Sequence, residues 1–141
     1  MTLRPETRAR ARALQLLYAW EMQSHPPMAE VASLAARFSG PGGGSLTTLE
    51  RAESLATAVA ADCVALDELA GRAAEHWRLE RMAVVERNIL RLGIHELRRG
   101  TAPPKVVIDE ALRLAHWFGG VQASAFINGI LDRIAHDLGL L

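Results

Sequence analysis

The chain has 141 residues, half of them hydrophobic and 23% charged, which is typical of one folded domain. Sixteen lysines and arginines balance sixteen aspartates and glutamates, which argues against a protein that grips nucleic acid over its whole surface. The sequence contains no apolar run of about eighteen residues that could span a membrane, and no apolar core of a secretory signal. These features predict a cytoplasmic protein without a membrane segment.

Apolar residues recur at helical spacing along the chain, and no alternation typical of strands interrupts them. The first helix is predicted over residues 6–24, with Tyr18 and Met22 in its apolar stripe, and Pro26-Pro27 should stop it. A short second helix follows those prolines. The glycine-rich sequence GPGGGS at residues 40–45 then predicts a flexible loop.

The third predicted helix begins at a capping box made by Thr47 and Glu50, and its buried face continues to Ala70. A fourth helix is predicted over about 82–99. Its apolar surface is unusually wide, which indicates a central helix packed on more than one side. Gly93 inside this helix is unfavourable by about 1 kcal/mol relative to alanine, so we expect another helix to approach closely there.

Two further helices complete the pattern. Pro103-Pro104 opens a fifth helix, which carries Phe118 in its apolar stripe and is closed by Gly119-Gly120. The sixth runs from about 122 to 138. The sequence has no internal repeat, so we predict an all-α fold with six or seven helices in one compact domain over residues 1–141.

Motifs for catalysis or metal binding are missing. The glycine-rich loop follows a helix and lacks the lysine of a phosphate-binding loop. His95-Glu96 begins like a zinc-protease motif, but Arg99 stands where the second histidine is required. The single cysteine, Cys63, lies in an apolar helical run and is predicted to be a small buried hydrophobic residue. We therefore predict no catalytic residue, no metal and no cofactor.

The N-terminal segment is the candidate anion site. Residues 1–20 carry four arginines against one glutamate, a net charge of +3. On a helix, Arg8 and Arg12 share one side and Arg10 points elsewhere. Arginine suits phosphate and also stacks on unpaired bases, so this helix either binds nucleic acid or forms an ordinary solvated face. A second charged strip on the fourth helix has the same two interpretations: Glu86, Arg87, Arg91 and Arg98.

Three stretches together resemble proteins of the NusB family. RARARALQLLYAW at 8–20 resembles their arginine-rich opening, and ERMAVVERNILRLGIHEL at 80–97 resembles their central helix. PPKVVIDEALRLAHWFGG at 103–120, followed by FINGILDRIA at 126–135, is similar to their closing signatures. The order and spacing also agree, and the resemblance covers nearly the whole chain.

The resemblance implies an all-α fold of two helical halves and a transcription antitermination factor without catalytic activity. Such proteins pair with the ribosomal protein NusE. The pair binds single-stranded boxA RNA of nascent ribosomal RNA leaders and works in the transcription elongation complex with other Nus factors.

Carried over to this sequence, the resemblance implies two surfaces. The RNA-binding residues would be Arg8, Arg10, Arg12, Gln122, Ser124 and Phe126. The partner-binding residues would be Glu86, Arg87 and Arg91.

The chain departs from the family pattern at several positions. Asp109 stands where asparagine is common, His116-Trp117 replaces a more usual lysine and small residue, and Ala125 lacks a charge. Each change removes a possible phosphate contact, so we expect modest RNA affinity without the partner. The alternative interpretation is a helical homodimer that acts as a protein-interaction scaffold and hides the N-terminal arginines.

Overall fold

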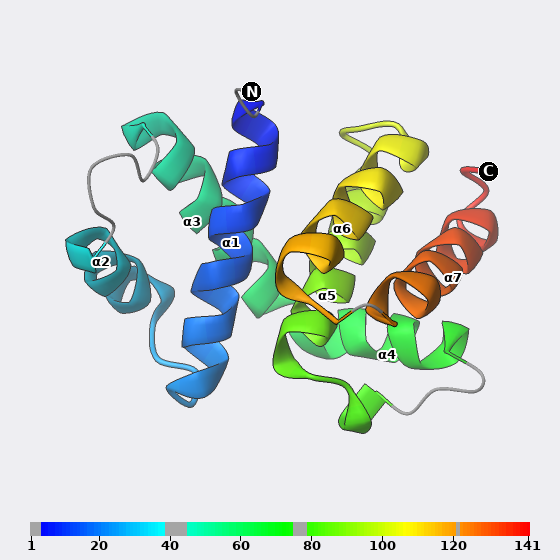
Figure 1. Cartoon of the computed structure of the whole chain (residues 1–141), viewed down its shortest axis with the longest axis horizontal. Helices are drawn as coiled ribbons and strands as arrows, with labels where there is room; N and C mark the ends of the chain where they lie inside the picture. The colour runs from blue at the N-terminus through cyan, green and yellow to red at the C-terminus, as the bar shows by residue number, and fades with distance from the viewer. Residues whose placement is uncertain (1–3, 39–44, 75–78, 121) are drawn as a thin grey trace. The chain divides into compact units, whose positions relative to one another are not determined.

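The computed structural model describes residues 4–38, 45–74, 79–120 and 122–141. These residues form seven α-helices and a short 3-10 helix, with no strand among them (Figure 1). The elements are α1 (Pro5–Met22), α2 (Met28–Phe38), α3 (Leu46–Ala61), α4 (Cys63–Ala73), η1 (Leu79–Arg81), α5 (Val84–Arg99), α6 (Pro104–Phe118) and α7 (Ala123–Asp137). The prediction of an all-α fold is confirmed. The loop predicted at 40–45 lies, apart from Ser45, outside the described residues.

The chain divides into two compact units, residues 1–61 and 62–141. The first contains α1 to α3, blue to blue-green in Figure 1, and the second contains α4 to α7, green to red. The two units agree with the two helical halves that the resemblance implies. The assignment of residues 1–141 to one domain stays a prediction.

In the first unit, α1 packs along α3 and against α2, and α2 also contacts α3. Ala13 of α1 and Ala52 and Ala56 of α3 are completely buried. Such small side chains let helix axes approach closely, because the distance between packed helices depends on the side chains at the contact. Larger buried residues fill the remaining space: Leu14, Leu17, Trp20, Val31 and Val59.

The predicted apolar stripe of α1 is wrong at its C-terminal end. Tyr18 is 42% exposed and Met22 is 60% exposed, whereas Trp20 is buried. Steps of four residues drift around a helix by about 40° each, so a series that starts at Leu14 leaves the buried face. The helix also ends at Met22, short of the predicted residue 24.

The long third helix of the prediction is two helices in the structure. Its cap is also different, because the Ser45 hydroxyl oxygen accepts the backbone N–H of Thr48 at 3.2 Å, in place of the predicted pair Thr47 and Glu50. The helix is interrupted at Asp62, whose φ of −103° and ψ of 10° are not helical. Since α3 packs on α1 and α2 while α4 packs on α5 and α7, the single apolar stripe serves two different cores.

In the second unit, α5 is the central helix and contacts α4, α6 and α7. A Cβ atom on Gly93 would lie 2.9 Å from Leu131 Cδ1 of α7. Both the central position of this helix and the close approach at Gly93 are therefore confirmed.

The ends of α6 are close to those expected, since Pro104 is its first residue and Gly119 follows its last. A Cβ on Gly119 would lie 3.0 Å from the carbonyl oxygen of Ala115, so a side chain would crowd this end. Two burial predictions fail in this unit. Phe118 is 42% exposed, and Cys63, the first residue of α4, is half-buried.

Candidate RNA and partner interface

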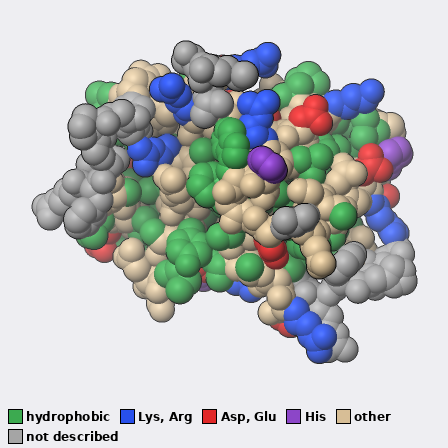
Figure 2. Space-filling model, viewed as in Figure 1, with side chains coloured by type: hydrophobic (Ala, Val, Ile, Leu, Met, Phe, Trp, Pro, Cys, Tyr) green, Lys and Arg blue, Asp and Glu red, His purple; other side chains and the backbone are tan. Residues whose placement is uncertain are grey.

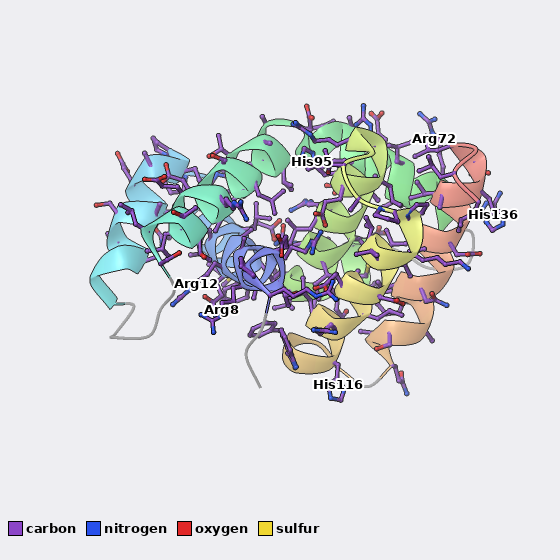
Figure 3. All side chains as sticks on the ribbon, turned by 90° about the horizontal axis from the view of Figure 1, so that it is seen from above. Arg8, Arg12, Arg72, His95, His116 and His136 are labelled. Carbon is purple, nitrogen blue, oxygen red and sulfur yellow. The ribbon has the colours of Figure 1, made fainter. Side chains whose placement is uncertain are left out.

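Two of the three predicted arginines of α1 reach solvent on one side of the helix. Arg8 is exposed and Arg12 is half-buried, and both side chains extend from the same side of α1 (Figure 3). An Arg12 Nη1 hydrogen donates to Gln15 Oε1 at 3.1 Å. This contact holds the Arg12 guanidinium near Gln15 on the same helix.

Arg10 differs from its neighbours because only 8% of it is exposed. Its helical position turns it away from Arg8 and Arg12, as the spacing predicted. The structure therefore does not bring the three arginines together on one surface. Glu6, the acidic residue in the first turn, lies 4.0 Å from Arg51 of α3, and both side chains are largely exposed, so this ion pair is weak.

The predicted residues around the start of α7 form a second candidate surface. Gln122 is the N-cap residue and is exposed, while its side chain makes no capping hydrogen bond. Ser124 and Phe126 are half-buried in the first turns of α7. The first turn contains no acidic residue, and a helix N-terminus of this kind attracts anions through its backbone N–H groups.

Glu86, predicted to bind the partner, lies beside this second surface. A Cβ on Gly120, in the turn between α6 and α7, would be 4.0 Å from Glu86 Oε1. The other carboxylate oxygen, Oε2, accepts the backbone N–H of Ala83 at 3.3 Å and so caps the start of α5. The structure therefore brings Glu86 next to the turn that precedes Gln122, and gives this residue a role in its own helix.

The other two residues predicted to bind the partner, Arg87 and Arg91, are less exposed than residues of a solvated helix face would be. Arg87 is half-buried, and Arg91 is 7% exposed. Arg91 Nε donates to Asp67 Oδ1 at 2.7 Å and Nη2 donates to Asp67 Oδ2 at 2.8 Å. A third bond runs from Arg91 Nη1 to Asn88 Oδ1 at 3.0 Å. The Arg91 guanidinium is thus engaged by residues of its own unit.

The prediction did not anticipate an aromatic group at the end of α6. Trp117 is 41% exposed, and its ring meets that of Phe118 edge to face, with centroids 6.4 Å apart. Arg113 lies one turn earlier, with Cζ 6.0 Å from the Trp117 ring centroid. The spacing of four residues between Arg113 and Trp117 was the signal in the sequence that could have revealed this group.

Exposed hydrophobic side chains occur in both units, and several reach the surface on the face drawn in Figure 2. None of the helices within the described ranges is long and apolar enough to cross a membrane. Across residues 4–38, 45–74, 79–120 and 122–141, no three His, Cys, Asp or Glu side chains are grouped to hold a metal ion.

Comparison with known proteins gives consistent matches. The model of the NusB family matches residues 7–136. The transcription antitermination protein NusB of Sorangium cellulosum is 42% identical over 131 residues, covering 92% of this chain and 91% of that protein. The protein of the same name from Anaeromyxobacter dehalogenans strain 2CP-C is 41% identical over 137 residues, covering 94% of this chain and 91% of its own.

Solved structures agree with these matches. The structure of T. maritima NusB is similar with a TM-score of 0.81 and 30% identity, covering 97% of this chain and 94% of that one. A structure described as antitermination factors NusB and NusE in complex with dsRNA has a TM-score of 0.81 and 24% identity. It covers 96% of this chain and 99% of its own, and at this identity it shows the shared fold.

Proposed function

The chain belongs to the NusB family, and from this premise we propose that it binds boxA-type RNA of nascent ribosomal RNA leader transcripts together with NusE. In this role it supports processive transcription in the elongation complex with other Nus factors. The observation that carries the proposal is the pair of arginines, Arg8 and Arg12, presented on one side of α1 in a chain whose net charge is otherwise negative.

We propose RNA contacts on each of the two units. On α1, Arg8 and Arg12 supply cationic forks for the phosphates of a single strand. Arg10 is buried, so we assign it the support of α1 rather than a phosphate contact. At the start of α7, the residues that the family resemblance implies supply an amide, a hydroxyl and an aromatic ring: Gln122, Ser124 and Phe126.

The proposed NusE surface lies around Glu86 and Arg87 at the start of α5. Glu86 has one carboxylate oxygen beside Gly120, which joins this surface to the turn that leads into α7. Arg91 supports this surface indirectly, because its bonds to Asp67 hold α5 against α4. A related fold solved with both NusE and double-stranded RNA supports a composite surface. The proposed function needs no catalytic step.

Salt dependence tests the RNA surface. Arg8→Ala combined with Arg12→Ala should weaken binding of a boxA-like single strand, because two phosphate contacts are lost. Each lost contact should reduce the log–log salt slope by about 0.7. Arg72→Ala, which removes an exposed arginine of α4, is the matched control and should change neither quantity.

An unchanged affinity and slope in the folded double variant would show that this side of α1 is only a solvated face. The competing homodimer is tested separately, by the mass in solution with and without RNA. A dimer that persists at saturating RNA, with the arginines protected from modification, would favour the scaffold.

A further inference from the structure

The last turn of α6 presents a flat aromatic surface with a cation above it. Trp117 and Phe118 are each more than 40% exposed, although such large apolar rings are usually covered. The edge-to-face contact between them restrains the indole ring, and Arg113 lies over its face. A restrained ring loses little conformational freedom when it stacks on a ligand.

The chemistry around this surface favours an unpaired nucleobase. Aromatic rings and arginine planes are the groups on which single-stranded bases stack, and every base has a suitable face. The neighbours are polar, since His116 extends outward from α6 and the exposed amide of Gln122 follows after residues 119–121. Hydrophobic docking of a protein helix would instead use a continuous apolar groove.

We propose that Trp117, supported by Phe118 and Arg113, is a stacking platform for one unpaired base of the bound RNA. The inference rests on the proposed RNA-binding function and adds a residue that the family pattern does not contain. His116-Trp117 stands where a lysine and a small residue are more usual, so a phosphate contact is exchanged for a base contact. Stacking is sequence-tolerant and releases no counterions, which separates it experimentally from the arginines of α1.

The test measures the affinity of the chain with NusE for a fluorescently labelled, boxA-like single-stranded RNA. Trp117→Ala should weaken binding by about 5-fold or more while leaving the salt slope unchanged, and Trp117→Phe should lose less. Val106→Ala removes part of another exposed apolar side chain on the same helix and should bind like the original chain. Circular dichroism checks that each variant is folded.

A scan with abasic nucleotides identifies the stacked base. At one position, removal of the base should weaken binding to the original chain but not further weaken binding to Trp117→Ala. If Trp117→Ala does not fold, the scan compares the original chain with Trp117→Phe instead. Removal of the stacked base should then weaken binding to the original chain more than binding to Trp117→Phe. The absence of any such position overturns the proposal.

Other outcomes are distinguishable. Equal affinity of Trp117→Ala and the original chain overturns the platform and leaves the proposed function intact. Weaker binding of NusE by Trp117→Ala in the absence of RNA also overturns the platform, because the aromatic group would then contact the partner protein. If the original chain with NusE does not bind the RNA at all, the proposed function itself fails.

Discussion

At the scale of single residues, Arg91 was predicted from the sequence to bind a partner, but in the structure its guanidinium bonds to residues of its own unit. Its guanidinium makes two short bonds to Asp67 and one to Asn88. Asn88, itself completely buried, donates from Nδ2 to the carbonyl oxygen of Val84. The bonds between Arg91 and Asp67 connect α5 to α4.

Removing the carboxylate should therefore destabilise the protein. We expect Asp67→Ala to lower the free energy of unfolding by about 2 kcal/mol, because it leaves a buried guanidinium without its counter-charge. This is less than the cost of breaking a fully buried pair, since 40% of the Asp67 side chain is exposed and water screens the charge. Urea denaturation measures the change.

The neighbouring Glu68→Ala, on the exposed side of α4, is the control and should stay within about 0.5 kcal/mol. Combining Asp67→Leu with Arg91→Met should recover most of the loss, because the buried charge is then removed with its partner. A single Asp67→Ala variant as stable as the original chain would contradict the structural role of the pair.

His95 on α5 should make stability depend on pH. Burial lowers the pKa of its imidazole below 6.5, and Arg99 adds to this, with a smaller contribution from Arg98. Glu96 and Asp62 oppose the shift. Because the pKa of His95 is lower in the folded chain, the unfolded chain binds more protons as the pH falls. The contribution of His95 to the free energy of unfolding is therefore fully present above about pH 6.5 and is lost as the pH drops below it.

The measurement compares the original chain with His95→Gln by urea denaturation at about pH 7.5 and about pH 5.5. The original chain should lose more free energy of unfolding over this interval than the variant does. The two proteins differ only at position 95, so the difference between their losses isolates His95. An equal loss in the two proteins would show that the histidine titrates alike in the folded and unfolded states.

At the scale of the elements, two helical glycines have opposite roles. Gly93 of α5 faces Leu131, whose two methyl groups lie 2.9 and 3.0 Å from the position of an added Cβ. Gly129 of α7 has no atom within 4 Å of that position. One glycine therefore permits contact between α5 and α7, while the other only loosens its helix.

Alanine substitution should separate the two effects. Gly129→Ala should raise the free energy of unfolding by up to about 1 kcal/mol, because alanine favours the helix. Gly93→Ala gains the same propensity but displaces the fully buried Leu131, so we expect a net loss of about 1 kcal/mol. Thermal unfolding of the two variants gives the signs directly. A stabilising Gly93→Ala would mean that Leu131 shifts without cost.

At the scale of the whole molecule, charge limits what the chain can do alone. A net charge of zero with a local +3 at the N-terminus provides few phosphate contacts. In the proposed partnership, NusE would supply the remaining contacts. The proposed RNA contacts near Gln122 and the proposed partner surface near Glu86 both adjoin Gly120. Binding of RNA and of NusE should therefore be coupled.

We expect NusE to tighten RNA binding by about 5- to 150-fold, a coupling of about 1–3 kcal/mol. Because coupling is reciprocal, RNA should tighten the protein pair by the same factor. Titrations of boxA-like RNA with the chain, with NusE and with both measure it. Independent binding by the two proteins would contradict a composite surface.

The charge of Glu86 provides the specific test of that surface. Glu86→Gln keeps an oxygen that can accept the Ala83 N–H, so it preserves the cap of α5 while removing the charge. Glu86→Arg reverses the charge and removes the cap. Loss of coupling in both variants places the partner near Glu86, whereas full coupling in both moves the partner surface elsewhere.

The sequence by itself determined the helical class, most helix positions and the central place of α5, because these depend on local signals. The apolar periodicity, Pro104 at the start of α6 and Gly119 at its end act within one or two turns of the chain. The same kind of local signal predicted that Arg8 and Arg12 lie on one side of α1. Residues four apart lie on one side of any helix, whatever surrounds it.

The tertiary structure alone decided which parts of those patterns are buried and which charges are used. The apolar stripe continues across Asp62, yet the helix breaks there because α3 and α4 pack into different units. Arg91 and Asp67 are 24 residues apart, and no local signal pairs them. The exposure of Trp117 likewise depends on what packs over α6, since burial is set by neighbours distant in sequence rather than by periodicity.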